Sequence, residues 1–416
     1  MSTKSSLVAG SALGVALALS LGVAAQAQDT TTTWRGAPQF ANESLTFKVR
    51  GRVYVDTVFQ DVDRTGTGVD FKASNTRLRT ARLGVEGTWN ANWAYKAEAS
   101  ISSGGGATQW EDLTLEYKPD ETTSFIVGNF KTVSLEDITS SRYNTMMERG
   151  AFNDFINAGR VMNVQVKKTG FNWTAAVAVS GDSLNSADVA TNAATGSRET
   201  FGYNGRVTYA PVMTDYTTVH VGGWYRYRNR GDQANFTYQV RNNTNYGARY
   251  VSTGAVGVSD KTIGLEGVLL HKNFSLQGEY ARITAERANK AADVDLNAYY
   301  VTASVFLTGE TRRYEAARGE FNRTRILNPV TAGGMGALEA AIRYDSTDLT
   351  DLKGVATAGK YTAWTAGLNW YPFSYVRFQA NYTKSKNDNP TVLTGTNAQL
   401  NDVDVNTFQL RAQFDF

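Results

Sequence analysis

Hydrophobic and polar residues alternate with a period of two along most of this 416-residue chain. The alternation is clearest over residues 45–59, 93–101 and 219–227, and it returns at the C-terminal end, 403–416. Successive side chains of a β-strand point to opposite faces, so this period predicts strands with one apolar face. Each segment has about the 9 to 11 residues that a tilted strand needs to cross a bilayer.

The connections between these segments alternate in length. Short ones lie at 90–92, 119–121, 170, 211–215, 272–273 and 372–373. Longer, polar ones lie at 61–74, 132–160, 182–197, 229–258, 286–294, 348–360 and 386–402. Short turns on one side and long loops on the other are typical of barrels in the bacterial outer membrane. Two connections depart from this order, a short one at 103–107 and a long one at 309–335.

The segments between these connections give 16 predicted strands: 45–60, 75–89, 92–103, 107–118, 122–131, 161–169, 171–181, 198–210, 216–228, 259–271, 274–285, 295–308, 336–347, 361–371, 374–385 and 403–416. An even number brings the last strand back beside the first, as closure requires. The fold class predicted is therefore all-β, a 16-stranded antiparallel transmembrane β-barrel over residues 45–416 with long extracellular loops. Residues 28–44 are polar and contain proline, and we expect an irregular periplasmic lead-in there.

The N-terminus has the features of an export signal. Lys4 precedes an apolar stretch, and Ala25-Gln26-Ala27 forms a small-x-small cleavage site. This order predicts a signal peptide over residues 1–27. A membrane-spanning helix is the alternative, but the apolar stretch is short and broken by Ser and Gly. An exported barrel of this kind is expected in the outer membrane of a Gram-negative cell.

Aromatic residues gather beside the short connections: Trp89, Trp93, Trp173, Tyr209, Tyr216, Trp370, Tyr371 and Tyr375. Trp and Tyr rings favour the level of the lipid headgroups, so these residues predict an interfacial girdle. The alternative is a soluble β protein with aromatic residues beside its turns.

The charges of the first strand decide which face looks into the barrel. If Val49 and Val53 face lipid, then Lys48, Arg50 and Arg52 face the lumen. The opposite assignment would place three cations in hydrocarbon, at about 2–4 kcal/mol each near the midplane.

The same argument puts a row of three arginines, Arg226, Arg228 and Arg230, on the lumenal face of a later strand. Neighbours in the row lie about 6–7 Å apart along the strand. Arg241 and Arg249 follow in the next long loop. Guanidinium groups bind phosphate oxygens in pairs and stay charged at any relevant pH, so the row is a candidate anion path. Alternatively, these arginines pair with lumenal carboxylates or bind lipopolysaccharide.

The second strand carries arginines of both parities. With Leu83 outward, Arg82 and Glu86 point inward and can form a lumenal pair. Arg77 and Arg79 then require a bulge or a position above the lipid. Arg79 is kept as a candidate pore residue.

Several blocks of the chain resemble the phosphate-selective porin O and P family: 82–89 (RLGVEGTW), 128–155 (GNFKTVSLEDITSSRYNTMMERGAFNDF), 307–315 (LTGETRRYE), 336–351 (GALEAAIRYDSTDLTD), 367–382 (GLNWYPFSYVRFQANY) and 408–416 (FQLRAQFDF). The resemblance implies a homotrimeric barrel whose third and fifth loops fold into the pore. It implies passage of phosphate or polyphosphate along a line of arginines and lysines.

The resemblance also assigns roles to particular residues. Lys131 falls on a position that lines the family's constriction, and the row Arg226, Arg228 and Arg230 falls on its line of arginines. Lys48 and Arg50 fall near its periplasmic basic cluster. The chain departs from the family at Arg79-Thr80, where adjacent arginines are common. This departure weakens the expectation of strict phosphate preference more than that of anion preference.

Other functional classes find little support in the sequence. Its two histidines, His220 and His271, lie outside any nucleophile motif, so no catalytic site is predicted. The acidic pieces 293–297 and 401–404 lack the glycine and spacing of a calcium loop. Without Lys4 the chain has 41 basic and 39 acidic residues, too small an excess to indicate a nucleic-acid partner. We expect neither a metal nor another cofactor.

These observations predict an anion-selective outer-membrane porin, a passive channel for phosphate or polyphosphate. The expected partners are those anions, membrane lipid and lipopolysaccharide, and two further copies of the chain. The alternatives are a general porin of weak selectivity and a closed barrel with a structural or adhesive role.

Overall fold

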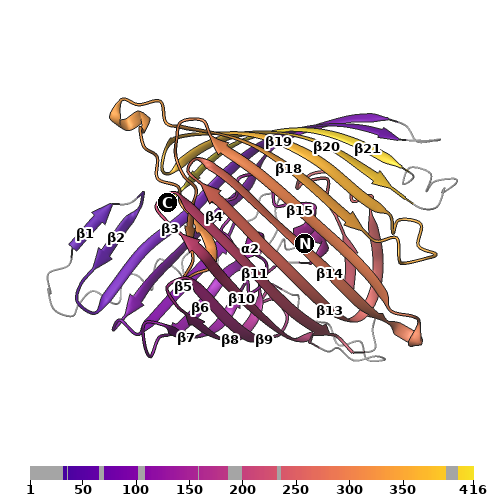
Figure 1. The fold of residues 1–416 in the computed structure, drawn as a ribbon, viewed down its shortest axis with the longest axis horizontal. Coiled ribbons are helices and arrows are strands. Elements are labelled where there is room, and N and C mark those ends of the chain that lie inside the picture. The colour runs from indigo at the N-terminus through magenta and orange to yellow at the C-terminus, as the bar shows by residue number, and fades with distance from the viewer. Residues whose placement is uncertain are drawn as a thin grey trace, which may run out of the picture.

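The computed structural model describes residues 31–34, 36–64, 70–101, 108–157, 159–185, 199–231, 236–389 and 402–416. The predicted signal peptide and the short loop 103–107 lie outside these residues. Sixteen antiparallel strands form one closed barrel, as predicted (Figure 1). Closure is made by the last strand, which pairs with the first from Val403 opposite Arg64 to Asp415 opposite Arg52.

The wall consists of β3 (Leu45–Arg64), β4 (Phe71–Trp89), β5 (Trp93–Ser100), β6 (Gln109–Tyr117), β7 (Thr123–Phe130), β8 (Val161–Thr169), β9 (Trp173–Ser180), β10 (Phe201–Met213), β11 (Thr217–Asn229), β13 (Ser252–His271), β14 (Phe274–Arg287), β15 (Val294–Phe306), β18 (Ala337–Asp348), β19 (Lys360–Phe373), β20 (Val376–Asp388) and β21 (Val403–Asp415). Each strand overlaps its predicted segment. The largest differences are at the loop ends of β3, β4 and β13, where pairing continues beyond the apolar part of the strand.

Five short strands add to the predicted set. The expectation of an irregular lead-in over 28–44 is wrong, because β1 (Thr31–Trp34) and β2 (Pro38–Ala41) form a hairpin there. β2 pairs with residues 46–48 of β3, which extend past the end of β21 and have a free edge. β12 (Phe236–Gln239) pairs with β13, and β16 (Arg313–Glu315) pairs with β17 (Glu320–Asn322) inside the long connection 309–335.

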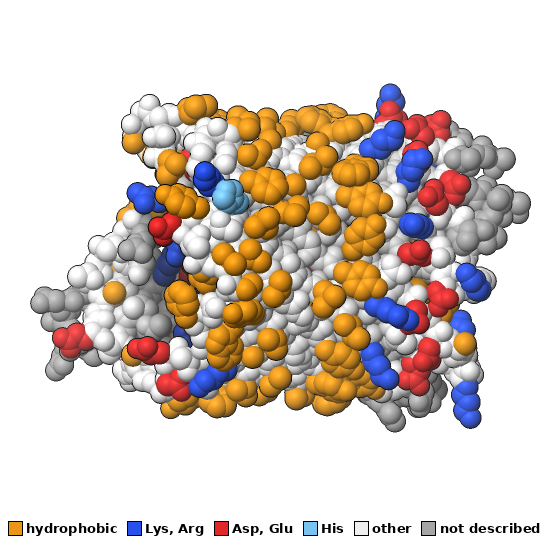
Figure 2. Space-filling model, in the orientation of Figure 1, with side chains coloured by type: hydrophobic (Ala, Val, Ile, Leu, Met, Phe, Trp, Pro, Cys, Tyr) orange, Lys and Arg blue, Asp and Glu red, His pale blue; other side chains and the backbone are white. Residues whose placement is uncertain are grey.

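The two faces of the wall follow the predicted parity. On β3, Val53 is 40% exposed on the outside, whereas Arg52 is 2% exposed on the inside. Figure 2 shows hydrophobic side chains over the middle of the outer surface and charged ones towards both ends, most of them at the loop end. Six of the eight predicted girdle aromatics are exposed: Trp89, Trp93, Trp173, Tyr209, Tyr216 and Trp370. Tyr371 instead faces inward, where its hydroxyl donates to Glu339 at 2.8 Å.

Part of the barrel interior is an apolar core. The third long loop contains α2 (Leu135–Ile138) and α3 (Ala151–Phe155). Phe152 and Phe155 of α3 pack in one buried cluster with Ile283 of β14 and Leu296 of β15. Inward-facing residues at this part of the wall are therefore apolar, and the rule of apolar outside and polar inside fails there.

Inward-facing side chains of several strands hold the rest of the third loop. Arg377 on β20 donates to the carbonyl of Asn144 at 2.7 Å, and Asn369 on β19 donates to that of Thr145 at 2.9 Å. On β3, which is separated from β20 only by β21, Arg52 donates to the Ser141 hydroxyl at 2.8 Å. This part of the loop is thus fixed to a group of neighbouring strands where the sheet closes. No helix among the described residues is long and apolar enough to cross a membrane.

A close approach of three strands gives a test of the wall packing. A Cβ on Gly87 would lie 1.9 Å from the Thr46 carbonyl oxygen, and Tyr95 reaches the same oxygen with its hydroxyl at 3.2 Å. A Cβ on Gly205 of β10 would meet its nearest atom only at 3.4 Å. We expect Gly87→Ala to destabilise the barrel by about 1–3 kcal/mol, because backbone must move.

Gly205→Ala is the matched control and should leave stability unchanged. Stability is measured as the temperature at which the compact barrel loses its fast migration in detergent gels. Equal midpoints for the two variants would contradict the packing described for Gly87.

Candidate functional site

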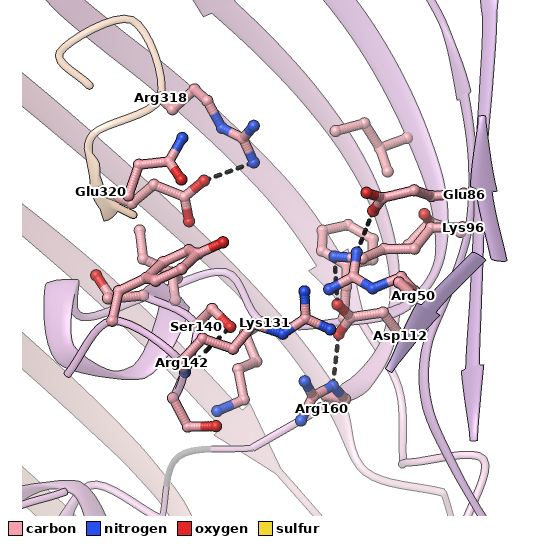
Figure 3. Close-up of a pocket in the computed structure, with 18 of the residues that line it drawn as sticks. Arg50, Glu86, Lys96, Asp112, Lys131, Ser140, Arg142, Arg160, Arg318 and Glu320 are labelled. Atoms are coloured by element: carbon pink, nitrogen blue, oxygen red, sulfur yellow. Dashed lines mark hydrogen bonds and ion pairs between the residues drawn. The ribbon is translucent and has the colours of Figure 1, made fainter. Parts of the chain in front are cut away.

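A cavity of about 840 Å³ lies beside the part of the wall that runs from β3 to β10. Its other sides come from the third loop and from residues 318–323 of the connection between β15 and β18 (Figure 3). The cavity therefore occupies the side of the interior away from the apolar core, where inward-facing side chains are mostly polar.

Positive side chains outnumber negative ones in the lining of this cavity. Thirteen cations line it: Lys48, Arg50, Arg52, Arg82, Lys96, Lys131, Arg142, Arg149, Arg160, Lys167, Arg206, Arg318 and Arg323. Five carboxylates line it: Glu86, Asp112, Glu116, Asp137 and Glu320. Five further carboxylates pair with these cations from outside the lining: Glu98, Glu111, Glu266, Glu315 and Asp415. Cations remain in excess even when all ten carboxylates are included.

Four of the residues predicted from the sequence meet in this cavity: Lys48, Arg50, Arg52 and Lys131. Arg50 and Arg52 both donate to the buried Glu98 carboxylate at 3.0 Å. Lys48 lies 3.8 Å from Glu86, which also pairs with Arg50. The guanidinium groups are therefore held in place by carboxylates behind them.

The predicted pair of Arg82 with Glu86 is not what the structure shows. Arg82 instead lies 2.7 Å from Glu111 and 3.5 Å from Glu98. The reason is distance, since residues four apart on one strand are separated by about 13 Å. Neighbouring strands are only about 5 Å apart, so the pairs form across the sheet.

Further ion pairs continue this network across the sheet, with positive and negative side chains alternating. Arg160 contacts Glu111 at 2.6 Å and Asp112 at 2.5 Å. Asp112 also accepts from Lys96 at 2.6 Å. Parity of the alternating residues could have found Lys96, but Arg160 lies in a loop whose path the sequence does not encode.

Lys131 follows the last residue of β7 and faces the cavity from the third loop. Its ammonium pairs with the Asp137 carboxylate and lies 3.2 Å from the Asp137 carbonyl oxygen. Arg149 donates to the carbonyls of Glu136 at 2.8 Å and Thr139 at 2.7 Å. Burial and, to a smaller extent, the Arg149 charge lower the pKa of Lys131 to about 7, although the Asp137 carboxylate opposes the change.

Two lining cations differ from the rest in their partners. Arg142 donates to the carbonyl of Gly51 at 3.1 Å and lies 3.7 Å from Glu98. Lys167 on β8 makes no ion pair or hydrogen bond within the described part of the chain, and its side chain is half-buried at the cavity. Lys167 is therefore the lining cation most free to meet a solute.

The connection 309–335 supplies a side of the cavity that the sequence did not suggest. Arg318 pairs with Glu320 at 2.6 Å, and the Gly319 carbonyl accepts from Arg206 at 2.7 Å. Arg323 pairs with Asp415 and lies 4.9 Å from the centre of the Tyr375 ring. A connection of this length suggested only a long turn, because nothing local encodes a return into the barrel.

The row Arg226, Arg228 and Arg230 is not part of this cavity. Arg226 donates to the carbonyl of Ile156, which follows α3. Arg228 donates to Asp260 at 3.1 Å and lies 4.4 Å from the centre of the Phe236 ring. The backbone N–H of Arg230 donates to the Val258 carbonyl at 3.0 Å. Arg226 and Arg228 point inward as their parity predicts, but α3 and β12 cover them.

The remaining predicted residues also lie away from the cavity. Arg79 donates with two nitrogens to Glu148, at 2.8 Å each, from a position where β4 has the bulge that its parity required. Arg241 lies 4.0 Å from Asp154 in the segment between β12 and β13. Arg249 is half-buried in the same segment.

Comparisons with known proteins agree with this architecture. The family model for phosphate-selective porin O and P matches residues 47–416. An uncharacterized protein of Caulobacter vibrioides is 29% identical over 361 residues, which cover 85% of this chain and 71% of that protein. Porin O of Pseudomonas aeruginosa is 28% identical over 449 residues, covering 97% of this chain and 98% of that protein.

A solved structure supports the fold independently. The anion-selective porin from Comamonas acidovorans superimposes with a TM-score of 0.51 at 15% identity, covering 89% of this chain and 100% of that one. The barrel, its outer apolar band and the match over nearly all of the wall lead to one conclusion. This chain is an outer-membrane β-barrel that belongs to the phosphate-selective porin O and P family.

Proposed function

We propose that this barrel is a passive channel for small oxyanions of the phosphate class. The observation that carries the proposal is the excess of lysine and arginine over carboxylate around the cavity. Membership of the phosphate-selective porin O and P family supports the same solute class, and the relative named Porin O supports a channel. Transport by this route requires no reaction, because the side chains only replace part of the hydration of the ion.

In the proposed mechanism, the existing ion pairs of the cations limit how tightly an anion binds. Arg50, Arg52 and Arg160 already hold a carboxylate each, so a passing anion shares their donors and does not take them over. Binding that is shared in this way is strong enough to admit an anion and weak enough to release it. Lys167 and the outer edges of the guanidinium groups are the proposed contacts.

We further propose that the third loop and the segment between β12 and β13 narrow the pore. Support comes from the contacts of residues 141–148 with inward-facing side chains and from Asn243, which donates to Asp345 at 2.7 Å. A homotrimer is part of the proposal and is supported by the trimeric form solved for OmpT of Vibrio cholerae. Phosphates of lipopolysaccharide at the loop end remain proposed partners.

A general porin of weak selectivity is the second candidate, and the same pairing of charges favours it. Current through one purified channel separates the possibilities. In a chloride gradient, a reversal potential on the anion side supports the proposal, and one on the cation side rejects it. A closed structural barrel passes no current. Titration with phosphate and then pyrophosphate tests the solute class through the block of chloride current.

Lys167 offers a matched test of the cavity. We expect Lys167→Gln to weaken phosphate block of chloride current about twofold to fivefold, since a charge in a hydrated site contributes about 0.5–1 kcal/mol. Lys168→Gln is the control, because its ammonium points to the other face of β8 and donates to Thr123 at 2.9 Å. An equal weakening of phosphate block in both variants would show that the cavity is not part of the conduction path.

Arg228 is expected to act on stability more than on selectivity. Arg228→Gln leaves Asp260 buried without its guanidinium, which costs about 3–5 kcal/mol. The control is Arg282→Gln, which breaks an exposed pair with Asp295 of 2.7 Å and should cost less than about 1 kcal/mol. Thermal unfolding of both variants measures the difference. If the Arg228→Gln channel were stable and had lost its phosphate block, the prediction would be wrong and the arginine row would be part of the conduction path.

The low pKa of Lys131 predicts a pH dependence. As pH rises through about 7, the ammonium loses its proton, so one positive charge leaves the cavity and anion preference falls. Reversal potentials between pH 6 and 8 measure this change. Lys131→Arg keeps its charge over that range and should remove the dependence. A variant that keeps the full pH dependence would show that another group is titrating.

A further inference from the structure

The connection between β15 and β18 carries a small apolar lobe on the outside of the barrel, residues 327–336. It appears as the orange loop that projects at the upper left of Figure 1, at the end of the barrel with the short turns. Before the lobe, Ile326 is buried inside with Phe306 and Tyr371. Within the lobe, Met335 is 64% exposed, and Leu327 and Val330 are also exposed.

The lobe lies against the lipid-facing surface of the wall. Trp370 follows the inward-facing Asn369 on β19 and therefore faces outward. It stacks on Phe378, which also faces outward, with ring centres 5.5 Å apart. Its indole N–H donates to the Met335 carbonyl at 2.8 Å. Leu307, at the end of β15, is exposed beside the lobe and bonds to Leu338 through its backbone. The apolar surface of the lobe is therefore continuous with the aromatic girdle.

Several backbone groups of the lobe are paired within it or with a neighbouring carboxylate. The backbone N–H of Gly336 donates to the Asn328 carbonyl at 2.8 Å and closes the loop. The backbone N–H of Gly334 donates to the Pro329 carbonyl at 3.0 Å. Leu327 donates to the buried Glu310 carboxylate at 3.2 Å. Positive φ angles at Gly333 and Gly336 allow these tight turns. A segment that enters an apolar environment must pair its backbone in this way.

The segment carries no charge over a greater length than the short turns at the same end. Residues 326–338 contain no Lys, Arg, Asp or Glu. The short turns vary: Asp120 and Glu121 lie between β6 and β7, whereas the turns 90–92 and 170–172 are uncharged. Charged turns suit water, whereas an uncharged lobe with exposed Leu, Val and Met suits the boundary between headgroups and acyl chains.

We propose that residues 327–336 insert into the periplasmic leaflet of the outer membrane and anchor this side of the barrel in phospholipid. The lobe follows directly from the segment that returns into the barrel at 313–323, so the anchor holds the outer end of that segment at a fixed depth. The proposal is independent of which ions the channel conducts.

The chain has no cysteine, so single labelling sites can be introduced cleanly. Met335→Cys carries an environment-sensitive dye in vesicles of phosphatidylethanolamine and phosphatidylglycerol that contain a nitroxide near the headgroup end of the acyl chain. We expect the nitroxide to quench most of the emission of this dye. Glu121→Cys is the control on the same rim and should keep its emission. Fast migration in detergent gels verifies that both variants are folded.

Two results would overturn the proposal. Emission at position 335 that matches the control, in wavelength and in resistance to quenching, would place the lobe in water. Unquenched emission together with crosslinking of position 335 to a second copy would assign the lobe to a subunit interface.

Discussion

The whole fold depends on the requirement that no backbone N–H or C=O group remain unpaired in hydrocarbon. The pairing of β21 with β3 meets this requirement by closing the sheet, and it ties the last residues of the chain to its first long strand. Once the sheet is closed, each strand has an outer face in lipid and an inner face in water or protein. The alternation of apolar and polar residues with a period of two follows from this difference between the two faces.

The inner face has its own electrostatic constraint. Cations packed at strand spacing repel one another, and partial burial makes each unpaired charge costly. Glu98, which bridges Arg50 and Arg52 and also lies near Arg82, stabilises this part of the wall. The same carboxylates lower the net attraction for an anion. The same carboxylates therefore stabilise the cavity and limit its selectivity for anions.

The sequence predicted strands and faces well because both depend on neighbours along the chain or directly across the sheet. Lys48, Arg50 and Arg52 were placed by parity alone. Arg228 was given the correct face, but parity carries no information about Phe236 and Asp260, which enclose it. Arg318 and Arg323 could not be placed because their position depends on a connection that turns back into the barrel.

The apolar core inside the barrel explains why parity fails as a guide to the pore. Ile283 and Leu296 face inward yet meet Phe152 and Phe155 of the third loop instead of water. A residue on the inner face lines the channel only where no loop covers it. The charged cavity accordingly lies on the side from β3 to β10, where the inner face keeps its charges. The path of the loops, more than the number of strands, decides which inward-facing cations remain uncovered.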